Sequence, residues 1–268
     1  MTELTMARAL NEGLRAAMES DPRVILFGQD IGRLGGVFRV TDGLQKDFGE
    51  HRVMDAPLAE SGIVGTAIGL AMRGYRPVVE IQFEGFVYPA FDQIVSQVAK
   101  MHRRTDGAVR IPMVIRMPYG GGIGAVEHHS ESPEAYFVHT AGLRVLTPSD
   151  PQSAFTTIQQ AIACDDPVIY FEPKRRYWDK GDVDLSTPLT SSGSLSPWRA
   201  RIVRPGSDVT IIAYGPMVRT CVEAAEASED ASLEVIDLQS LSPLDFATIV
   251  ESVERTGRAV IVHEASRT

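Results

Sequence analysis

Short, largely apolar runs alternate along this chain with longer amphipathic segments, and this alternation constrains the fold more than any other feature. Five such runs lie before residue 175, at residues 23–28, 77–83, 112–117, 143–148 and 167–173. Runs with few polar positions are typical of strands that are buried on both faces. Because short connections join them to helical segments, the pattern predicts a mostly parallel α/β sheet covered by helices on both sides.

The segments between these runs have helical periodicity. Thr5 can cap a first helix, in which Met6, Leu10, Leu14 and Ala17 recur on one face. Further helices are expected over residues 60–72, 90–104 and 151–163.

The pattern lapses between Lys174 and Pro205 into charged, Ser-rich and Pro-containing sequence, which predicts a linker. We therefore expect a first domain over residues 1–174, a linker over 175–205 and a second, smaller α/β domain over 206–268. The second domain should hold three strands and two helices, over residues 208–214, 217–228, 233–238, 243–257 and 258–264. A three-stranded sheet buries little surface, so this domain is expected to be incomplete as given.

Charge and cysteine content exclude several classes of protein. With a formal net charge of -9 over 268 residues, a general binder of nucleic acid or of an anionic membrane is not expected, since phosphate would be repelled. The two cysteines, Cys164 and Cys221, are too few and too far apart for a disulfide framework or a thiolate metal cluster, which favours a reducing cytoplasm. No apolar window reaches the roughly 18 residues that a membrane span requires, and no signal peptide is expected.

Six segments, taken together, resemble a known family. They are residues 27–44, 55–83, 88–100, 128–151, 166–177 and 233–265. In this order they are similar to the β subunit of the thiamine-diphosphate-dependent, decarboxylating component of 2-oxo acid dehydrogenase complexes, and closer to branched-chain than to pyruvate enzymes. The resemblance implies a pyrimidine-binding domain followed by a transketolase C-terminal-like domain. Family members usually continue past residue 265, so this chain resembles a shortened copy.

The resemblance assigns the cofactor contacts. The acid of "PLAE", Glu60, matches the family's carboxyl that contacts the aminopyrimidine ring, where a hydrogen bond to N1′ favours the tautomer that can accept the thiazolium proton. Leu58, Gln82 and Phe86 match further contacts of that ring. Many relatives have tyrosine at the position of Phe86. Phenylalanine can stack on the ring but cannot donate the hydrogen bond of a phenolic hydroxyl. From the residues alone, Glu60 would be an ordinary acid in a first helical turn.

A histidine pair marks the loop "EHHSESPE". A metal site is weakly supported here, because neighbouring histidines rarely bind one metal ion. A Ser-His hydrolase is also weakly supported, because the sequence lacks a nucleophile-elbow motif. In the family, the histidine directly before "S-x-S" takes part in acyl transfer to the lipoyl arm, which maps to His129. His128 has a less certain role, and an exposed structural histidine remains the alternative for His129.

A monovalent cation, expected to be K⁺, is implied by the same resemblance. Its ligands would be the backbone carbonyls of Met113, Ala161, Cys164 and Asp166. An ordinary turn from helix to strand explains this segment equally well.

Two further patterns allow more than one interpretation. Small residues at Gly62, Gly65 and Gly69 permit close approach of another backbone, either the chain's own sheet or a second subunit. The cations Lys174, Arg175 and Arg176 are typical of a solvated face, although they could dock an acidic partner.

A missing motif predicts a partner. Thiamine-diphosphate enzymes typically hold Mg²⁺ and the diphosphate with a "GDG" motif followed further on by asparagine, and this chain has no "GDG". Transketolase-like enzymes carry the motif in the same chain. We therefore expect a separate α subunit to hold Mg²⁺, in an α2β2 assembly that decarboxylates a branched-chain 2-oxo acid and passes the acyl group to a lipoyl domain. The alternatives are a pyruvate dehydrogenase β subunit and a non-catalytic scaffold subunit.

Overall fold

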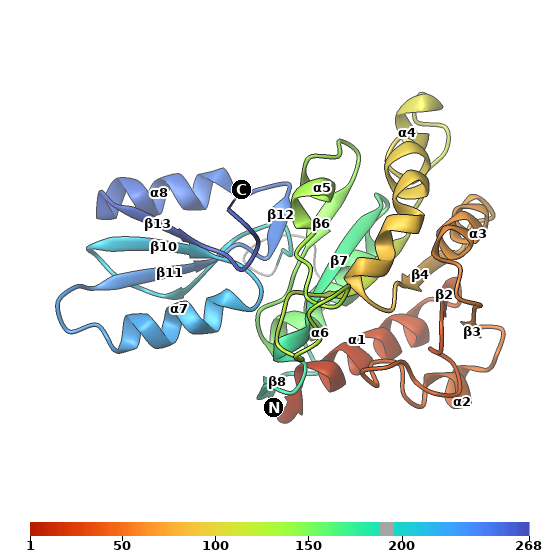
Figure 1. The fold of residues 1–268 in the computed structure, drawn as a ribbon, viewed down its shortest axis with the longest axis horizontal. Coiled ribbons are helices and arrows are strands. Elements are labelled where there is room, and N and C mark those ends of the chain that lie inside the picture. The colour runs from red at the N-terminus through yellow and green to blue at the C-terminus, as the bar shows by residue number, and fades with distance from the viewer. Residues whose placement is uncertain (188–195, 268) are drawn as a thin grey trace.

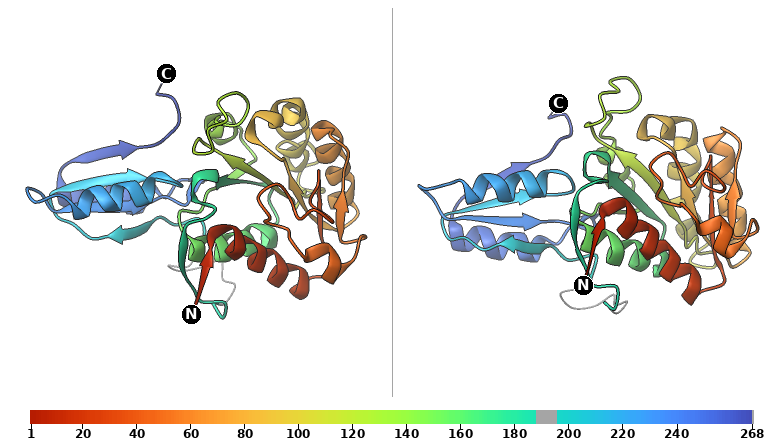
Figure 2. Two further views of the ribbon diagram at one scale, coloured as in Figure 1. Left: turned by 60° about the horizontal axis from the view of Figure 1, so that its bottom comes forward. Right: turned by 90° about the horizontal axis from the view of Figure 1, so that it is seen from below.

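The computed structural model describes residues 1–187 and 196–267. Two large sheets lie side by side in the described residues, each with helices on both faces (Figure 1). Residues 1–187 form the larger body, and most of residues 196–267 form the smaller one (Figure 2). The structure therefore has the predicted α/β class.

The larger sheet has seven strands among the described residues. In spatial order they are β12 (Ser240–Ser242), β6 (Arg144–Leu146), β7 (Val168–Pro173), β5 (Val114–Tyr119), β4 (Arg76–Glu80), β2 (Val24–Gly28) and β3 (Val53–Asp55). All neighbouring strands are parallel except β12, which pairs antiparallel with β6. The predicted parallel sheet is thus confirmed, with an antiparallel strand added at one edge.

Two apolar cores lie on opposite faces of this sheet. On one face pack α1 (Met6–Ser20) and α6 (Pro151–Ala163), against strand residues such as Val78 and Val168. On the other face lie α3 (Glu60–Met72), the helical turns η1 (Glu84–Ala90) and η2 (Gln93–Val98), and α5 (Glu134–Val138), against residues such as Val79 and Ile169. Consecutive strand residues face opposite cores because side chains alternate along a strand.

The predicted helix start at Thr5 is confirmed. The Thr5 side chain accepts a hydrogen bond from the Arg8 amide at 3.2 Å, and the expected apolar face of α1 is buried. The helix expected over residues 90–104 differs, since η2 has π-helical hydrogen bonds and α4 (Met101–Arg104) follows separately. Apolar periodicity places residues on a face but does not fix the hydrogen-bond register, so the sequence could not distinguish these forms.

The smaller sheet has four strands in the described part of the chain. Their order is β13 (Ala259–Val262), β10 (Val209–Ala213), β11 (Leu233–Asp237) and β9 (Arg201–Arg204), of which β9 runs antiparallel to β11. Helices α7 (Met217–Glu226) and α8 (Phe246–Thr256) cover opposite faces (Figure 1). The expected three strands and two helices are present, and β9 adds a fourth strand.

The segment expected to be a linker, residues 175–205, contains regular structure. Besides the 3-10 turn η3 (Lys174–Arg176), strand β8 (Lys180–Val183) pairs antiparallel with β1 (Thr2–Thr5), and β9 completes the smaller sheet. These short strands lack an apolar run because each is paired along one edge only. The Ser-rich residues 188–195 lie outside the described residues.

The chain's remaining helix, α2 (Leu44–Phe48), follows a glycine-rich loop after β2. That loop uses the backbone angles expected of it, with positive φ at Asp30, Gly35, Gly36 and Arg39. In the described residues, no helix combines the length and the apolar character needed to cross a membrane.

Candidate active site

The predicted site residues follow strands of the larger sheet at the edge where its parallel strands end. Leu58 and Glu60 follow β3, Gln82 and Phe86 follow β4, and His129 lies in the loop after β5. Carboxyl ends of parallel strands meet at one edge of a sheet, where α/β proteins commonly bind ligands. The topology therefore brings all five predicted residues to the same edge.

Glu60 is the first residue of α3 and its carboxylate has no protein partner. Its side chain is 7% exposed, and no hydrogen bond or ion pair joins it to any other described residue. Ala59, at the N-cap, provides no side-chain cap. The carboxylate oxygens of Glu60 keep access to solvent, so they are open to a ligand that donates a hydrogen bond. Nearby in sequence, Leu58 is 65% exposed, so a ligand or a partner chain can reach it.

Gln82 links β4 to the loop after β2. Its Nε2 donates a hydrogen bond to Asp30 Oδ2 at 3.2 Å. Asp30 has a φ of 58°, so the backbone turns sharply there and directs its carboxylate toward this edge. The amide oxygen of Gln82 stays available as an acceptor.

Phe86 and His129 are brought together across 43 residues of sequence. Their ring centroids are 5.3 Å apart in an edge-to-face arrangement, and the Phe83 ring lies 3.9 Å from the His129 ring. The Phe83 and Phe86 rings are themselves in edge contact at 5.8 Å. The imidazole Nδ1 is buried without a hydrogen-bond partner among the described residues. His129 therefore lies against an aromatic wall, whereas His128 is exposed and has a positive φ of 61°.

Lys174 is buried, so both interpretations of it as part of a surface cation cluster are wrong. Its side chain is fully buried and forms an ion pair with Glu84, and its Nζ donates to the His129 carbonyl at 2.7 Å. Glu84 Oε1 also accepts from the Glu131 amide at 2.9 Å. Burial raises the pKa of Glu84 and lowers that of Lys174, and their mutual attraction opposes both shifts.

The two arginines after Lys174 differ from it. Arg175 is exposed, as the solvated-face interpretation expects. Arg176 is half-buried and donates two hydrogen bonds to the Pro216 carbonyl, at 3.1 and 2.7 Å, which ties η3 to the start of α7.

Acidic side chains meet where the loop after β5 approaches the smaller sheet. Burial raises the pKa of Glu134 to about 7, although a hydrogen bond from the Tyr214 hydroxyl at 3.3 Å favours the ionised form. Glu264 Oε1 accepts from the Gly121 amide at 2.8 Å. The second carboxylate oxygens of Glu84, Glu134 and Glu264 are all buried, and none has a partner in the part of the chain that the structure describes.

A buried chain of charges lies beneath this edge of the sheet. Arg116 pairs with Glu80 at 2.6 Å and with Glu172 at 2.7 Å, and the Tyr177 hydroxyl donates to Glu172 at 2.6 Å. Burial alone would lower the pKa of Arg116, but the two carboxylates outweigh it and raise that pKa. The three strands β4, β5 and β7 are thereby cross-linked by side chains as well as by the backbone.

Three of the four carbonyls expected to bind K⁺ are already acceptors within the protein. The Met113 carbonyl accepts from the Val168 amide, the Ala161 carbonyl from the Cys164 amide, and the Cys164 carbonyl from Arg76 Nη1 at 3.0 Å. A carbonyl can accept a second partner, but the Arg76 guanidinium is itself a cation at this place. The structure thus gives the K⁺ site no support, and it stays a prediction.

The glycines of α3 face open space. A Cβ placed on Gly69 would meet no atom within 4 Å, and one on Gly62 or Gly65 would meet its nearest neighbour at 3.6 or 3.8 Å. Close packing of these glycines against the chain's own sheet is therefore wrong. The interpretation as a contact with another subunit stays a prediction.

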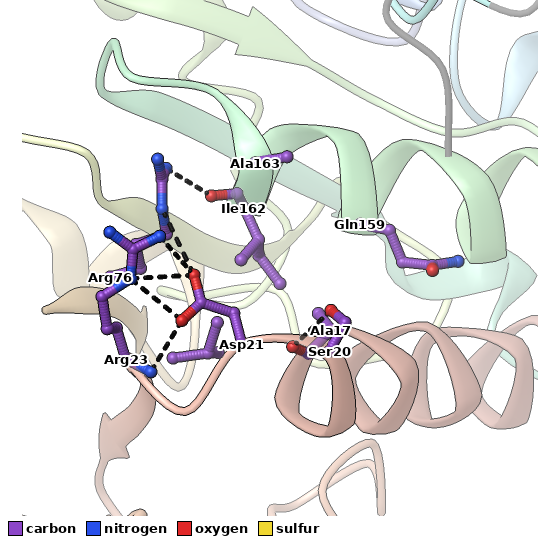
Figure 3. A pocket seen from close by; sticks show the side chains of 9 residues that line it. Ala17, Ser20, Asp21, Arg23, Arg76, Gln159, Ile162 and Ala163 are labelled. Carbon is purple, nitrogen blue, oxygen red and sulfur yellow. Dashed lines mark hydrogen bonds and ion pairs between the residues drawn. The ribbon is translucent and has the colours of Figure 1, made fainter. Parts of the chain in front are cut away.

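A cavity of about 230 Å³ lies at the opposite edge of the sheet. Figure 3 shows it between the end of α1 and α6, where Asp21 forms ion pairs with Arg23 and Arg76. It includes none of the predicted site residues. In the described ranges, no group of three or more His, Cys, Asp or Glu side chains is arranged to hold a metal ion.

Sequence reasoning missed four residues of this edge, namely Asp30, Phe83, Glu84 and Lys174. Each of them follows the end of a parallel strand within a few residues, and this position was the signal that could have identified them. The role of Lys174 was not predicted, because a run of three cationic residues is typical of a solvated surface.

Two domain families match the chain. The model described as "Transketolase, pyrimidine binding domain" matches residues 2–179, and the one described as "Transketolase, C-terminal domain" matches residues 199–268. Among solved structures, a protein titled "Split gene transketolase, inactive beta4 tetramer" has a TM-score of 0.79 at 22% identity, over 98% of this chain and 80% of that one. This likeness shows the fold.

Three curated relatives are similar over almost the whole chain. The "Pyruvate dehydrogenase E1 component subunit beta" of Leifsonia xyli subsp. xyli is 61% identical over 98% of this chain and 77% of that protein. The "3-methyl-2-oxobutanoate dehydrogenase subunit beta" of Mycobacterium tuberculosis is 54% identical over 98% of this chain and 75% of that protein. The "2-oxoisovalerate dehydrogenase subunit beta" of Pseudomonas aeruginosa is 47% identical over 100% of this chain and 80% of that protein.

The names of these relatives include both pyruvate and branched-chain types, so they do not decide the subtype. What they share is the component and the subunit, and the two matched domains agree with the two α/β bodies of the fold. The chain therefore belongs to the E1 β subunits of the thiamine-diphosphate-dependent 2-oxo acid dehydrogenases.

Proposed function

We propose that this chain is the β subunit of an α2β2 branched-chain 2-oxo acid dehydrogenase, which decarboxylates its substrate oxidatively and transfers the acyl group to a lipoyl domain. One observation carries the proposal: Glu60 is largely buried at this edge, and its carboxylate has no partner among the described residues. Such a group is free to accept a hydrogen bond from a ligand, and the family's cofactor has a ring that can donate one.

The residues present fit thiamine diphosphate. When bound, the cofactor supplies a nucleophilic carbon and accepts the electron pair released with CO₂. Glu60 would hydrogen-bond the pyrimidine ring and hold a proton there. Phe86 would pack against the ring face and Leu58 would cover it, which excludes water from the reacting atoms.

His129 would act at the second stage. Its imidazole is held against Phe83 and Phe86 and has an unpartnered Nδ1. A neutral imidazole can exchange a proton with a sulfur atom of the lipoyl group while the acyl group is transferred. His129 is therefore proposed as the residue that assists acyl transfer, and Glu60 as the one that activates the cofactor.

An α subunit is proposed to supply Mg²⁺ and the diphosphate half of the site. The support is the missing "GDG" motif together with the exposed Leu58 and the open glycine face of α3. A cytoplasmic location also stays a prediction, in keeping with Cys164 and Cys221, which are both free.

A pyruvate dehydrogenase β subunit is the second candidate, and the relative at 61% identity favours it. Selectivity between the two substrates depends on the volume of a pocket that the partner chain completes. Co-expression with an α subunit, followed by decarboxylation assays on pyruvate and on 3-methyl-2-oxobutanoate, separates them. We expect the higher kcat/KM on 3-methyl-2-oxobutanoate, and the reverse order would establish the pyruvate type.

Substitution of Glu60 tests the site itself. We expect Glu60→Gln to leave assembly intact and to lower decarboxylation by roughly 100-fold or more, since acid-base catalysis contributes on that order. Glu50→Gln is the matched control, because Glu50 is exposed and has no side-chain partner in the described part of the chain. If Glu60→Gln retains normal turnover and normal cofactor binding, the chain is a scaffold subunit and the proposal is wrong.

A further inference from the structure

The loop that carries His129 is held on both sides of the next residue, Ser130, by one buried ion pair. Lys174 Nζ donates to the carbonyl of His129 at 2.7 Å, and Glu84 Oε1 accepts from the amide of Glu131 at 2.9 Å. Lys174 and Glu84 also pair with each other, and both side chains are fully buried. A single pair of charges thus fixes the backbone immediately before and after Ser130.

Lys174 and Glu84 follow two different strands of the larger sheet. Glu84 starts η1 after β4, and Lys174 comes directly after β7, so the pair spans β5, from which the loop emerges. The base of the loop is closed by a hydrogen bond from the Gly120 amide to the Glu131 carbonyl at 2.8 Å. The pair therefore anchors a long loop to the rigid part of the fold.

The imidazole is oriented from a second direction by the same cluster. Lys174 Nζ lies 5.6 Å from the centroid of the Phe83 ring, and the Phe83 ring lies 3.9 Å from that of His129. At Gly85 the loop backbone is so close that an added Cβ would meet the His128 carbonyl oxygen at 2.4 Å. His129 thus has little freedom while the ion pair is intact.

We propose that Lys174 and Glu84 form a positioning pair, which sets the location of His129 for acyl transfer and takes no part in decarboxylation. This inference rests on the proposed function of His129. Neither side chain bonds the imidazole itself, since Lys174 bonds the backbone carbonyl of His129 and Glu84 bonds the backbone amide of Glu131. Their effect must therefore pass through the position of the loop.

Charge matters to this arrangement because both groups are dry. An unpaired charge here is costly, whereas loss of both charges together is tolerated far better. A purely structural pair and a positioning pair therefore predict different rates of acyl transfer for the double variant that lacks both charges. Removing both charges should restore stability in either case, but only a structural pair would also restore the acyl transfer.

The experiment uses Lys174→Met, Glu84→Gln and the double variant, each assembled with the α subunit. Two rates are measured: decarboxylation with an artificial electron acceptor, and reductive acylation of an isolated lipoyl domain. We expect Lys174→Met and the double variant to lose roughly 10- to 100-fold in acylation relative to decarboxylation, as a misplaced group does. In the double variant the resistance to urea should return toward that of the wild type while acylation stays low.

A second readout does not depend on activity. Hydrogen exchange over residues 120–133 of the isolated chain should be faster in Lys174→Met and in the double variant than in the wild type. Arg175→Met is the matched control, since it removes an exposed charge from the adjacent position, and it should leave exchange unchanged. If the loop is released but the wild-type assembly has no acylation activity, the proposed function fails while the anchoring role stands.

Either of two results would overturn the positioning role. One is a double variant that recovers both stability and acylation, which would make the pair structural. The other is unchanged hydrogen exchange over residues 120–133 in Lys174→Met, which would show that other contacts hold the loop.

Discussion

The two sides of the candidate site differ in how far the chain completes them by itself. On the side of β5 and β7, His129 is held by rings and by the buried pair of Lys174 and Glu84. On the side of β3 and α3, the carboxylate of Glu60 has no partner among the described residues, and Leu58 is exposed. The first side is pre-organised, and the second has polar and apolar groups that another molecule must satisfy.

This difference suggests which functions belong to the isolated chain. A group fixed by its own fold keeps its geometry whatever binds, whereas an open carboxylate and an open leucine gain their environment only on binding. The following predictions test whether the division is real, starting with the largest expected effect.

Arg116 should matter most to the pre-organised side. Arg116→Met would leave Glu80 and Glu172 buried without their cation, and we expect it to lower the free energy of unfolding by about 3–5 kcal/mol. Urea denaturation measures this loss. Arg110→Met is the control, since its pair with Asp165 is more than half exposed, and it should cost less than about 1 kcal/mol. Equal losses in the two variants would contradict a dry interior beneath the loop.

Glu134 should make the stability of the folded chain depend on pH on this side of the site. Its pKa is raised from 4.5 to about 7, so between these values the folded chain keeps a proton that the unfolded chain releases. Its contribution to stability is therefore present below pH 4.5 and is lost as the pH rises to about 7, by roughly 3 kcal/mol in all. We expect Glu134→Gln to remove this loss.

Urea denaturation of Glu134→Gln and the wild type at pH 4.5 and pH 8 measures the effect. The variant should gain on the wild type at pH 8 only, whereas Glu254→Gln, at an exposed position, should gain at neither pH. A gain of the same size at both pH values would show that the proton on Glu134 is not the cause.

Gly85 tests the contact between η1 and the His129 loop. In Gly85→Ala the new Cβ would overlap the backbone of His128, so we expect a loss of about 1–3 kcal/mol and faster hydrogen exchange over residues 120–133. Gly62→Ala is the control, because its Cβ would be 3.6 Å from the nearest atom. Unchanged exchange in Gly85→Ala would mean that the loop is not seated on this glycine.

Gly69 tests the open side and should have the smallest effect. Gly69→Ala fills space that no described atom occupies, so the isolated chain should gain about 0.5–1 kcal/mol from the better helix former. If this face of α3 contacts another subunit, the same change should weaken assembly, as measured by analytical ultracentrifugation with the α subunit. Stabilisation without any loss of assembly would place the interface elsewhere.

The parts of the fold that the sequence predicted are those with a strong local pattern. The runs at residues 23–28 and 167–173 coincide with β2 and β7 to within one residue, because buried parallel strands consist mostly of apolar residues. Strands β3, β9 and β12 have three or four residues each and no apolar run. They depend on partners that are distant in sequence, which a local pattern cannot reveal.

The candidate site was predictable in its members but not in its contacts. The family resemblance indicated Glu60, Gln82 and His129, and for Gln82 the end of a predicted strand pointed the same way. The contact of His129 with Phe86 depends on the path of a loop, and the burial of Lys174 depends on Glu84, which is 90 residues away. Neither the spacing of residues nor the composition can predict contacts between residues so far apart in the sequence.

Strand β12 belongs by sequence to the smaller body and by pairing to the larger sheet, where it adds to the edge at β6. Dividing the gene between the two bodies would therefore strip a strand from the first and expose backbone groups along β6, a surface that recruits other strands. The two bodies should accordingly melt in a single transition. An attempt to express the first body alone would have to retain residues 240–242 or cap that edge in some other way.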